Sequence, residues 1–148
     1  VHAAVQAAKE AGATLVCGGQ YEGAFYEPTI ISGVHPSMSI FREEVFGPVL
    51  TVTPFAGVTE AISLANDSDY GLSSAVLTND ISKAMRVARQ VEAGMVHING
   101  TTVQCEPQAP FGGLKMSGLG RESTKAYIDQ MSETKWVTIQ SRRGEYPF

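Results

Sequence analysis

Two adjacent carboxylates, Glu43 and Glu44, lie immediately before the sequence Val-Phe-Gly-Pro-Val at residues 45–49. Two buried carboxylates side by side would repel each other, so we expect one to be solvated and the other to be available to a ligand. A carboxylate can accept hydrogen bonds from both hydroxyls of a ribose, and the ring of Phe46 can pack against a flat heterocycle. The same residues would also suit two surface acids before a strand with a buried phenylalanine.

A second candidate is the segment 99–120, which is rich in glycine and has no hydrophobic period. A loop of this length inside a compact domain is usually functional or disordered. It follows a short apolar run at 95–98, and open α/β sheets bind ligands at the carboxyl ends of their strands. Phe111 in this loop is therefore either a binding-site aromatic or an ordinary core side chain.

The two cysteines are weak candidates for catalysis. Cys105 lies in the loop, but no cationic residue is adjacent and the neighbouring Glu106 disfavours a thiolate. We expect Cys105 to line a pocket or to be inert. Cys17 ends an apolar run before two glycines and is expected in the core.

The other residues that often carry chemistry form no recognisable site. His2, His35 and His97 are scattered without metal-ligand spacing, so no metal site is expected. We interpret His97 as a structural histidine whose hydrogen bonds are satisfied. The glycines at 118–120 do not complete a dinucleotide-binding fingerprint, and no P-loop is present.

Hydrophobic periodicity predicts the elements that position these residues. Helices are expected from the start of the chain to Gly12, from a Thr59 cap to Asn66, from an Asn79 or Asp80 cap to Gly94, and over 124–131. Strands are expected at 14–17, 29–31, 49–55, 73–77, 95–98 and 134–140. Strand–helix alternation over 49–98 implies parallel pairing. The predicted fold is α/β, an open, mostly parallel sheet with flanking helices.

Composition narrows the class of protein. The chain has 148 residues, of which 43% are hydrophobic, with a net charge of -4 and no basic block, so no nucleic-acid partner is expected. No apolar run approaches the roughly 20 residues needed to cross a membrane. Two cysteines predict a reducing, cytoplasmic location. The chain starts at Val1, within a predicted helix, and this start indicates a fragment or a processed product.

Several of these motifs, taken in order, resemble the C-terminal part of aldehyde dehydrogenases. The resemblance is carried by Glu-Glu-Val-Phe-Gly-Pro-Val at 43–49, Asn-Asp-Ser-Asp-Tyr-Gly-Leu-Ser at 66–73, Val-His-Ile-Asn at 96–99 and Pro-Phe-Gly-Gly-Leu-Lys-Met-Ser-Gly-Leu-Gly-Arg-Glu at 110–122. It extends from the opening helix to the last strand, and it implies an NAD- or NADP-dependent enzyme.

The resemblance also implies roles for individual residues. Glu44 would hold the ribose on the nicotinamide side of the cofactor, and Phe46 would contact the nicotinamide region. Phe111 would line the tunnel through which the aldehyde enters. The variable residues Thr102 to Cys105, with Val103 and Gln104 between them, would shape the acyl side of the pocket.

The family's catalytic cysteine lies in a Gly-Gln-x-Cys setting before the Glu-Glu-x-Phe-Gly-Pro run, and no such motif occurs between Val1 and Arg42. We therefore expect no catalytic residue in this chain, which would be the last third of a subunit and inactive alone. The parent enzyme would oxidise an aldehyde to a carboxylic acid. The run His97 to Thr102 is most similar to bacterial dehydrogenases for aromatic aldehydes such as benzaldehyde, salicylaldehyde or vanillin.

The terminal segment predicts assembly. Residues 1–132 would form the C-terminal part of the catalytic domain, and 133–148 an oligomerisation strand and tail that join a dimer or tetramer, with Trp136 buried at the contact. Two alternatives remain: a non-catalytic assembly or interaction module of the same fold, and an aldehyde-forming reductase that uses acyl phosphates. The Glu-Glu-x-Phe-Gly-Pro run argues against the reductase.

Overall fold

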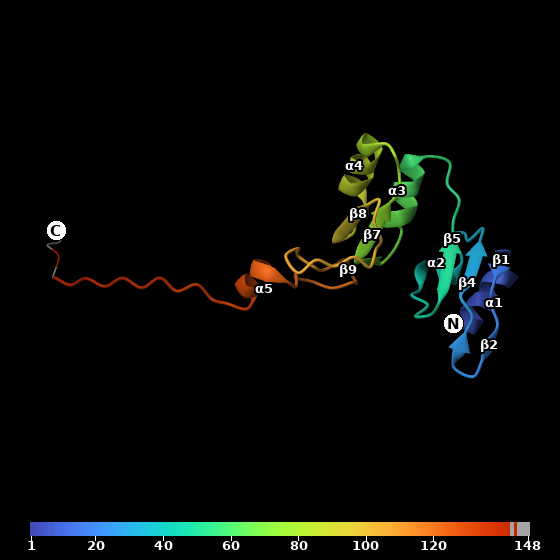
Figure 1. Cartoon of the computed structure of the whole chain (residues 1–148), viewed down its shortest axis with the longest axis horizontal. Helices are drawn as coiled ribbons and strands as arrows, with labels where there is room; N and C mark the ends of the chain where they lie inside the picture. Colours follow the sequence, from blue (N-terminus) through green and yellow to red (C-terminus); the bar gives the residue numbers. More distant parts are fainter. Residues whose placement is uncertain (143, 145–148) are drawn as a thin grey trace.

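The computed structural model describes residues 1–142 and 144, and its elements form two lobes followed by an extended tail (Figure 1). The helices are α1 (His2–Glu10), α2 (Ser39–Arg42), α3 (Val58–Asn66), α4 (Ile81–Gln90) and α5 (Thr124–Gln130). The strands are β1 (Thr14–Cys17), β2 (Tyr21–Glu22), β3 (Phe25–Tyr26), β4 (Thr29–Ser32), β5 (Val49–Val52), β6 (Tyr70–Gly71), β7 (Ser73–Val76), β8 (Met95–Ile98) and β9 (Leu114–Lys115). The predicted α/β class is confirmed.

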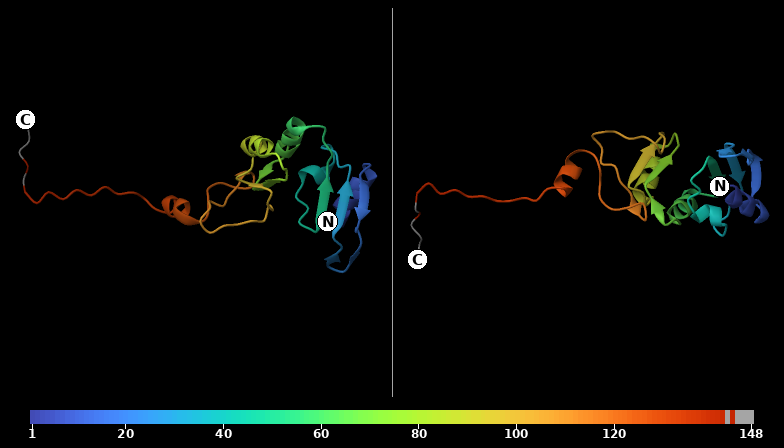
Figure 2. Two further views of the ribbon diagram at one scale, coloured as in Figure 1. Left: turned by 45° about the horizontal axis from the view of Figure 1, so that its top comes forward. Right: turned by 90° about the horizontal axis from the view of Figure 1, so that it is seen from below.

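The first lobe, residues 1–53, is built on a three-stranded sheet in the order β1-β4-β5. β4 pairs with β1 in the antiparallel direction and with β5 in the parallel direction. The chain reaches β5 through α2 and the Glu-Glu-Val-Phe-Gly-Pro run, so this run forms the turn that leads into a parallel edge strand. The short hairpin of β2 and β3 extends from the same lobe (Figure 2).

The core of the first lobe lies on one face of this sheet. Val5 and Ala8 of α1 pack with Ile40 of α2 and with Ile31 of β4, and all four side chains are buried. The apolar face of α1, whose periodicity predicted this helix, thus covers the sheet. Hydrophobic burial on this face is the main term that holds the lobe together.

No described residue covers the opposite face of the sheet, and that face holds Cys17, which was expected in the core. Cys17 is opposite Ile30 in the register, and Ile30 is opposite Leu50, so the three side chains share a face. The Leu50 side chain is 59% exposed and Cys17 is exposed as well. The prediction that Cys17 is a core residue is wrong, because helices cover only the other face.

The second lobe, residues 58–122, contains the predicted strand–helix–strand unit. β7 and β8 pair in parallel, with Ser73 opposite Met95, and α4 packs against both strands beside α3. The Asp80 side chain caps α4 by accepting a hydrogen bond from the Lys83 amide at 3.0 Å. The parallel crossover is confirmed, whereas β5 and β7 do not pair, so each lies at the edge of its own sheet.

The start of α3 differs from the prediction. Gly57, not Thr59, is the residue that precedes the helix, and it makes no side-chain cap. Thr59 lies inside the first turn, where its Oγ1 accepts a hydrogen bond from Arg86 Nη2 of α4 at 3.1 Å. The hydroxyl that suggested a cap instead joins the two helices.

Residues 131–142 run away from both lobes and form no ladder within the described part of the chain (Figures 1 and 2). The predicted strand at 134–140 therefore has no partner here, and Trp136 is 89% exposed. Arg143 and residues 145–148 of the predicted tail lie outside the described residues. Among the described helices, none has the length and apolar character that a membrane crossing requires.

Candidate functional site

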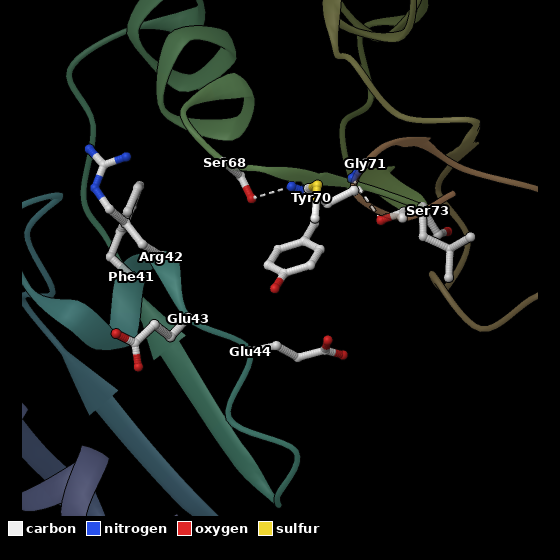
Figure 3. A pocket seen from close by; sticks show the side chains of 11 residues that line it. Phe41, Arg42, Glu43, Glu44, Ser68, Tyr70, Gly71 and Ser73 are labelled. Carbon is white, nitrogen blue, oxygen red and sulfur yellow. Dashed lines mark hydrogen bonds between the residues drawn. The ribbon is translucent and has the colours of Figure 1, made fainter. Parts of the chain in front are cut away.

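A cavity of about 510 Å³ separates the end of the first lobe from the second lobe. One wall is formed by α2 and the acidic pair that follows it, and the facing wall comes from the turn after α3 and from β6 and β7 (Figure 3). Met116 and Ser117 complete the lining. Both belong to segment 99–120, which we call the glycine-rich loop. We call this space the acidic cavity.

Glu44 and Glu43 both line the acidic cavity, but their side chains diverge. Figure 3 shows Glu44 extending below the Tyr70 ring, whereas Glu43 points the other way. Within the described part of the chain, the Glu44 carboxylate has no hydrogen-bond or ion-pair partner. Its oxygens are therefore free to accept hydrogen bonds from a polyhydroxylated ligand such as a ribose, and Glu44 lies on the same side as the glycine-rich loop.

Phe46 does not line the acidic cavity. Its side chain is 86% exposed, and its backbone φ is +46°, in the left-handed region that bulky residues rarely occupy. Asn99 and Lys115, both in the glycine-rich segment 99–120, also have a positive φ of 54°. Strained backbone of this kind clusters at binding sites, and here it turns an aromatic ring outward beside the acidic pair.

The glycine-rich loop is tied to the wall of the acidic cavity by backbone contacts. β6 pairs with β9, and the Met116 amide donates to the Asp69 carbonyl at 2.8 Å. Ser117 Oγ accepts a hydrogen bond from the Gly71 amide at 2.9 Å. These bonds bring residues 110–118 to the turn after α3, across more than 40 positions of sequence.

Lys115 holds this arrangement from within the loop. Its Nζ donates to the carbonyl oxygens of Asn66 at 2.8 Å and Ser68 at 2.9 Å, and forms an ion pair with Glu92 at 2.7 Å. A cation at the last carbonyls of a helix is favourable because those groups lack helical partners. Lys115 therefore fixes the end of α3 against the loop.

Arg42 and Asp67 form the bridge between the two walls. The guanidinium donates two hydrogen bonds to the carboxylate, at 2.9 and 2.8 Å. The hydrogen bond from Arg42 lowers the pKa of Asp67 below its ordinary value, and the same bond raises the pKa of Arg42.

The lowered pKa of Asp67 predicts a pH dependence with a defined sign. A depressed folded-state pKa stabilises the fold above the ordinary aspartate value of about 3.9 and loses that contribution as the pH falls through the folded-state pKa. We expect carbon NMR titration of the Asp67 carboxyl to give a lower pKa than in the Arg42→Ala variant. Equal pKa values in the two proteins would contradict the pairing in solution.

A second cavity, of about 310 Å³, lies between β8 and the glycine-rich loop. It brings together two of the predicted substrate residues, Cys105 and Phe111, whereas Thr102 does not line it. The loop packs closely on β8 because Gly94 has no side chain: a Cβ atom there would overlap the carbonyl oxygen of Gly112. This small, largely apolar space is suited to an aromatic ring.

His97 also lines the second cavity, but its Nε2 atom is buried without a hydrogen-bond partner among the described residues. The interpretation of His97 as a satisfied structural histidine is therefore wrong at this nitrogen. Cys105, in contrast, is exposed, as expected for a loop thiol.

Sequence reasoning missed the residues that hold the two walls together. Arg42, Asp67 and Lys115 are charged residues in ordinary surface patterns, and their partners are 23 or more positions away. No local period predicts such contacts. The only available signal was that all three lie inside or beside the segments that carry the family resemblance.

Comparison with known proteins gives a consistent result. Residues 1–137 match the aldehyde dehydrogenase family. The chain is 50% identical over 137 residues to a salicylaldehyde dehydrogenase of Pseudomonas putida, covering 93% of this chain and 28% of that protein. It is 40% identical over 149 residues to an NAD(+) benzaldehyde dehydrogenase of the same species, covering 100% of this chain and 31% of the relative.

A solved structure of a related enzyme has the same fold over this region. The crystal structure of a salicylaldehyde dehydrogenase from Pseudomonas putida G7, complexed with salicylaldehyde, is similar with a TM-score of 0.89 and 48% identity, over 99% of this chain and 30% of that one. The chain thus spans less than a third of the length of the relatives that it matches.

Proposed function

The chain belongs to the aldehyde dehydrogenase family, and on this premise we propose that it forms the C-terminal third of an NAD(P)-dependent subunit that oxidises an aromatic aldehyde to a carboxylic acid. The observation that carries the proposal is the acidic cavity, in which Glu44 lines the same space as Met116 and Ser117 of the glycine-rich loop, and its carboxylate has no partner among the described residues. The term complete subunit is used below for a polypeptide that contains both this chain and the remaining part of such a subunit.

The residues of this chain would bind and orient rather than react. Glu44 would accept hydrogen bonds from the two ribose hydroxyls, and the outward ring of Phe46 would pack on the nicotinamide region. The bound NAD(P)+ supplies a hydride acceptor. Both side chains fit this role, because one offers free acceptor oxygens and the other an uncovered aromatic face.

The substrate side of the proposal rests on the second cavity. Phe111 would provide an apolar wall for an aromatic ring, and Cys105 would shape the acyl side without acting as the nucleophile. Thr102, in the same loop, would also shape the acyl side of the pocket. The similarity to a salicylaldehyde and a benzaldehyde dehydrogenase supports an aromatic aldehyde as the substrate class.

The thiolate that attacks the aldehyde and the base that activates water would come from polypeptide outside this chain. We therefore propose that the chain by itself has no dehydrogenase activity, and that the complete enzyme works in the cytoplasm.

A chimera tests the proposal directly. Residues 1–137 of this chain would replace the matched segment of the Pseudomonas putida salicylaldehyde dehydrogenase, and formation of reduced nicotinamide would be followed by absorbance. We expect the chimera to oxidise salicylaldehyde and the isolated chain to show no turnover. A folded but inactive chimera would favour a non-catalytic assembly module, and turnover by the isolated chain would contradict the inactive assignment.

We further propose that residues 134–140 add as a strand to the sheet of a neighbouring subunit. Alternation of side chains and the lack of any partner within the described chain support this role, and Trp136 would be covered by the contact.

Covalent footprinting with hydroxyl radicals, read by peptide mass spectrometry, checks the position of Trp136. We expect Trp136 to be modified several-fold more slowly in the oligomer of the complete subunit than in the isolated chain. Phe25, at the exposed hairpin, serves as the reference because its reactivity should not change. Equal modification of Trp136 in both forms would rule out the contact.

A further inference from the structure

Arg42 makes an unusually complete set of contacts for a surface residue. Its Nη1 and Nη2 atoms donate to the two carboxylate oxygens of Asp67, and its Nε donates to the Pro36 carbonyl at 3.1 Å. The two-pronged geometry orients the guanidinium as well as attracting it. Arg42 is thus fixed within the first lobe while it holds a residue of the second.

The position of this pair matters for the acidic cavity. Arg42 is two residues before Glu44, and Asp67 is the C-cap residue of α3 and directly precedes Ser68 in the wall of the cavity. In the part of the chain that the structure describes, this pair supplies the hydrogen bonds that join residues 1–53 to residues 58–122. The distance between the two walls of the acidic cavity therefore depends on the pair of Arg42 and Asp67.

Asp67 is itself held firmly by the second lobe. The neighbouring Asn66 side chain donates to the Gln90 carbonyl at 2.8 Å and accepts from the Glu92 amide at 2.8 Å, which ties the end of α3 to the end of α4. Lys115 binds the carbonyls on both sides of Asp67. Asp67 is therefore a fixed anchor, and Arg42 is the group that docks on it.

Stability alone does not account for this arrangement. The Arg42 and Asp67 side chains are 51% and 44% exposed, and ion pairs with such exposure contribute little to the free energy of unfolding. What the pair does determine is the orientation of the segment that carries Glu44. A carboxylate must be held within about half an ångström of its productive position to bind both hydroxyls of a ribose well.

We propose that Arg42 is a positioning residue for cofactor binding, and that its ion pair with Asp67 sets Glu44 against the wall formed by residues 68–73 and the glycine-rich loop. This inference rests on the function proposed above. Arg42 itself does not touch the cofactor, and its effect on cofactor binding comes from its contact with Asp67.

A double-mutant cycle in the complete subunit tests the inference. Arg42→Ala and Asp67→Asn are each expected to raise the Kd for NAD(P)+ about tenfold, equivalent to about 1.4 kcal/mol, and the double variant is expected to be no worse than either single one. Arg42→Lys keeps the positive charge but cannot make the two parallel hydrogen bonds to Asp67, so its cofactor affinity should lie between those of the unmodified subunit and Arg42→Ala. The KM for the aldehyde and the thermal midpoint should change little in all of them.

The matched control is Lys125→Ala, which removes an exposed ion pair of α5 that does not border the acidic cavity. This variant should bind the cofactor as the unmodified subunit does. A loss in Arg42→Ala without a loss in Asp67→Asn would mean that Arg42 contacts the cofactor directly, and it would overturn the positioning role.

Three other outcomes are also decisive. An equal rise of the cofactor Kd and the aldehyde KM, with a lower thermal midpoint, would reduce the pair to a structural role and overturn the inference. An unmodified complete subunit that oxidises no aldehyde would instead refute the proposed function itself. Cofactor affinity that is unchanged in an active Arg42→Ala subunit refutes only the inference.

Discussion

Replacing Glu44 with glutamine in the complete subunit is expected to raise the KM for NAD(P)+ by roughly 30-fold, because a hydrogen bond to a charged group contributes about 2 kcal/mol. The glutamine side chain has nearly the same size, but its amide nitrogen cannot accept a hydrogen bond from a hydroxyl. Steady-state kinetics at saturating aldehyde, with the cofactor concentration varied, measures the effect.

Glu43→Gln is the matched control for this substitution. The two residues are adjacent, both border the acidic cavity, and each variant removes one negative charge. Because the Glu43 side chain diverges from that of Glu44, its replacement should alter the KM for the cofactor much less. A larger effect from Glu43 would show that the two carboxylates have been assigned in the wrong order.

The largest effect on stability is expected from Ile31→Ala in the 148-residue chain. Ile31 is completely buried in the central strand of the first lobe, between β1 and β5 and beneath α1. Truncation of a buried isoleucine leaves a cavity in addition to the lost burial, so we expect a loss of about 3 kcal/mol in the free energy of unfolding. Urea unfolding followed by circular dichroism gives the value.

Ile30→Ala provides the comparison, since the residue type, the strand and the secondary structure are the same. Ile30 lies on the uncovered face and is only partly buried, so its replacement should cost about 1 kcal/mol. Similar losses for both variants would mean that the uncovered face becomes covered in solution, for example by a second copy of the chain.

The sequence predicted those elements that have a clear hydrophobic period or a strong local signal. α1, α4, β7 and β8 were located to within a few residues, and the Asp80 cap was identified. The four-residue helix α2 and the two-residue strands β6 and β9 were not predicted. Elements this short carry no period and exist because of partners that are distant in the sequence.

The residues of the candidate site show the same difference between local sequence signals and contacts that are distant in the sequence. Glu44 and the glycine-rich loop were predicted because they lie in contiguous motifs, and Glu44 borders the acidic cavity together with Met116 and Ser117 of that loop. The pair of Arg42 with Asp67 and the contacts of Lys115 were not found, because a lone charge in a sequence does not indicate its partner. The misplacement of Cys17 has a related cause, since an apolar run predicts a strand but not which face is covered.

The unpaired edges of β5 and β7 have a practical consequence for anyone who produces this chain. An edge strand with free backbone amides and carbonyls is a template on which further copies can add, above all when apolar side chains such as Leu50 lie beside it. Residues 1–148 expressed alone are therefore expected to aggregate at high concentration, so the unfolding and footprinting measurements need dilute protein, whereas in the complete subunit proposed above neighbouring polypeptide would occupy these edges as the chain folds.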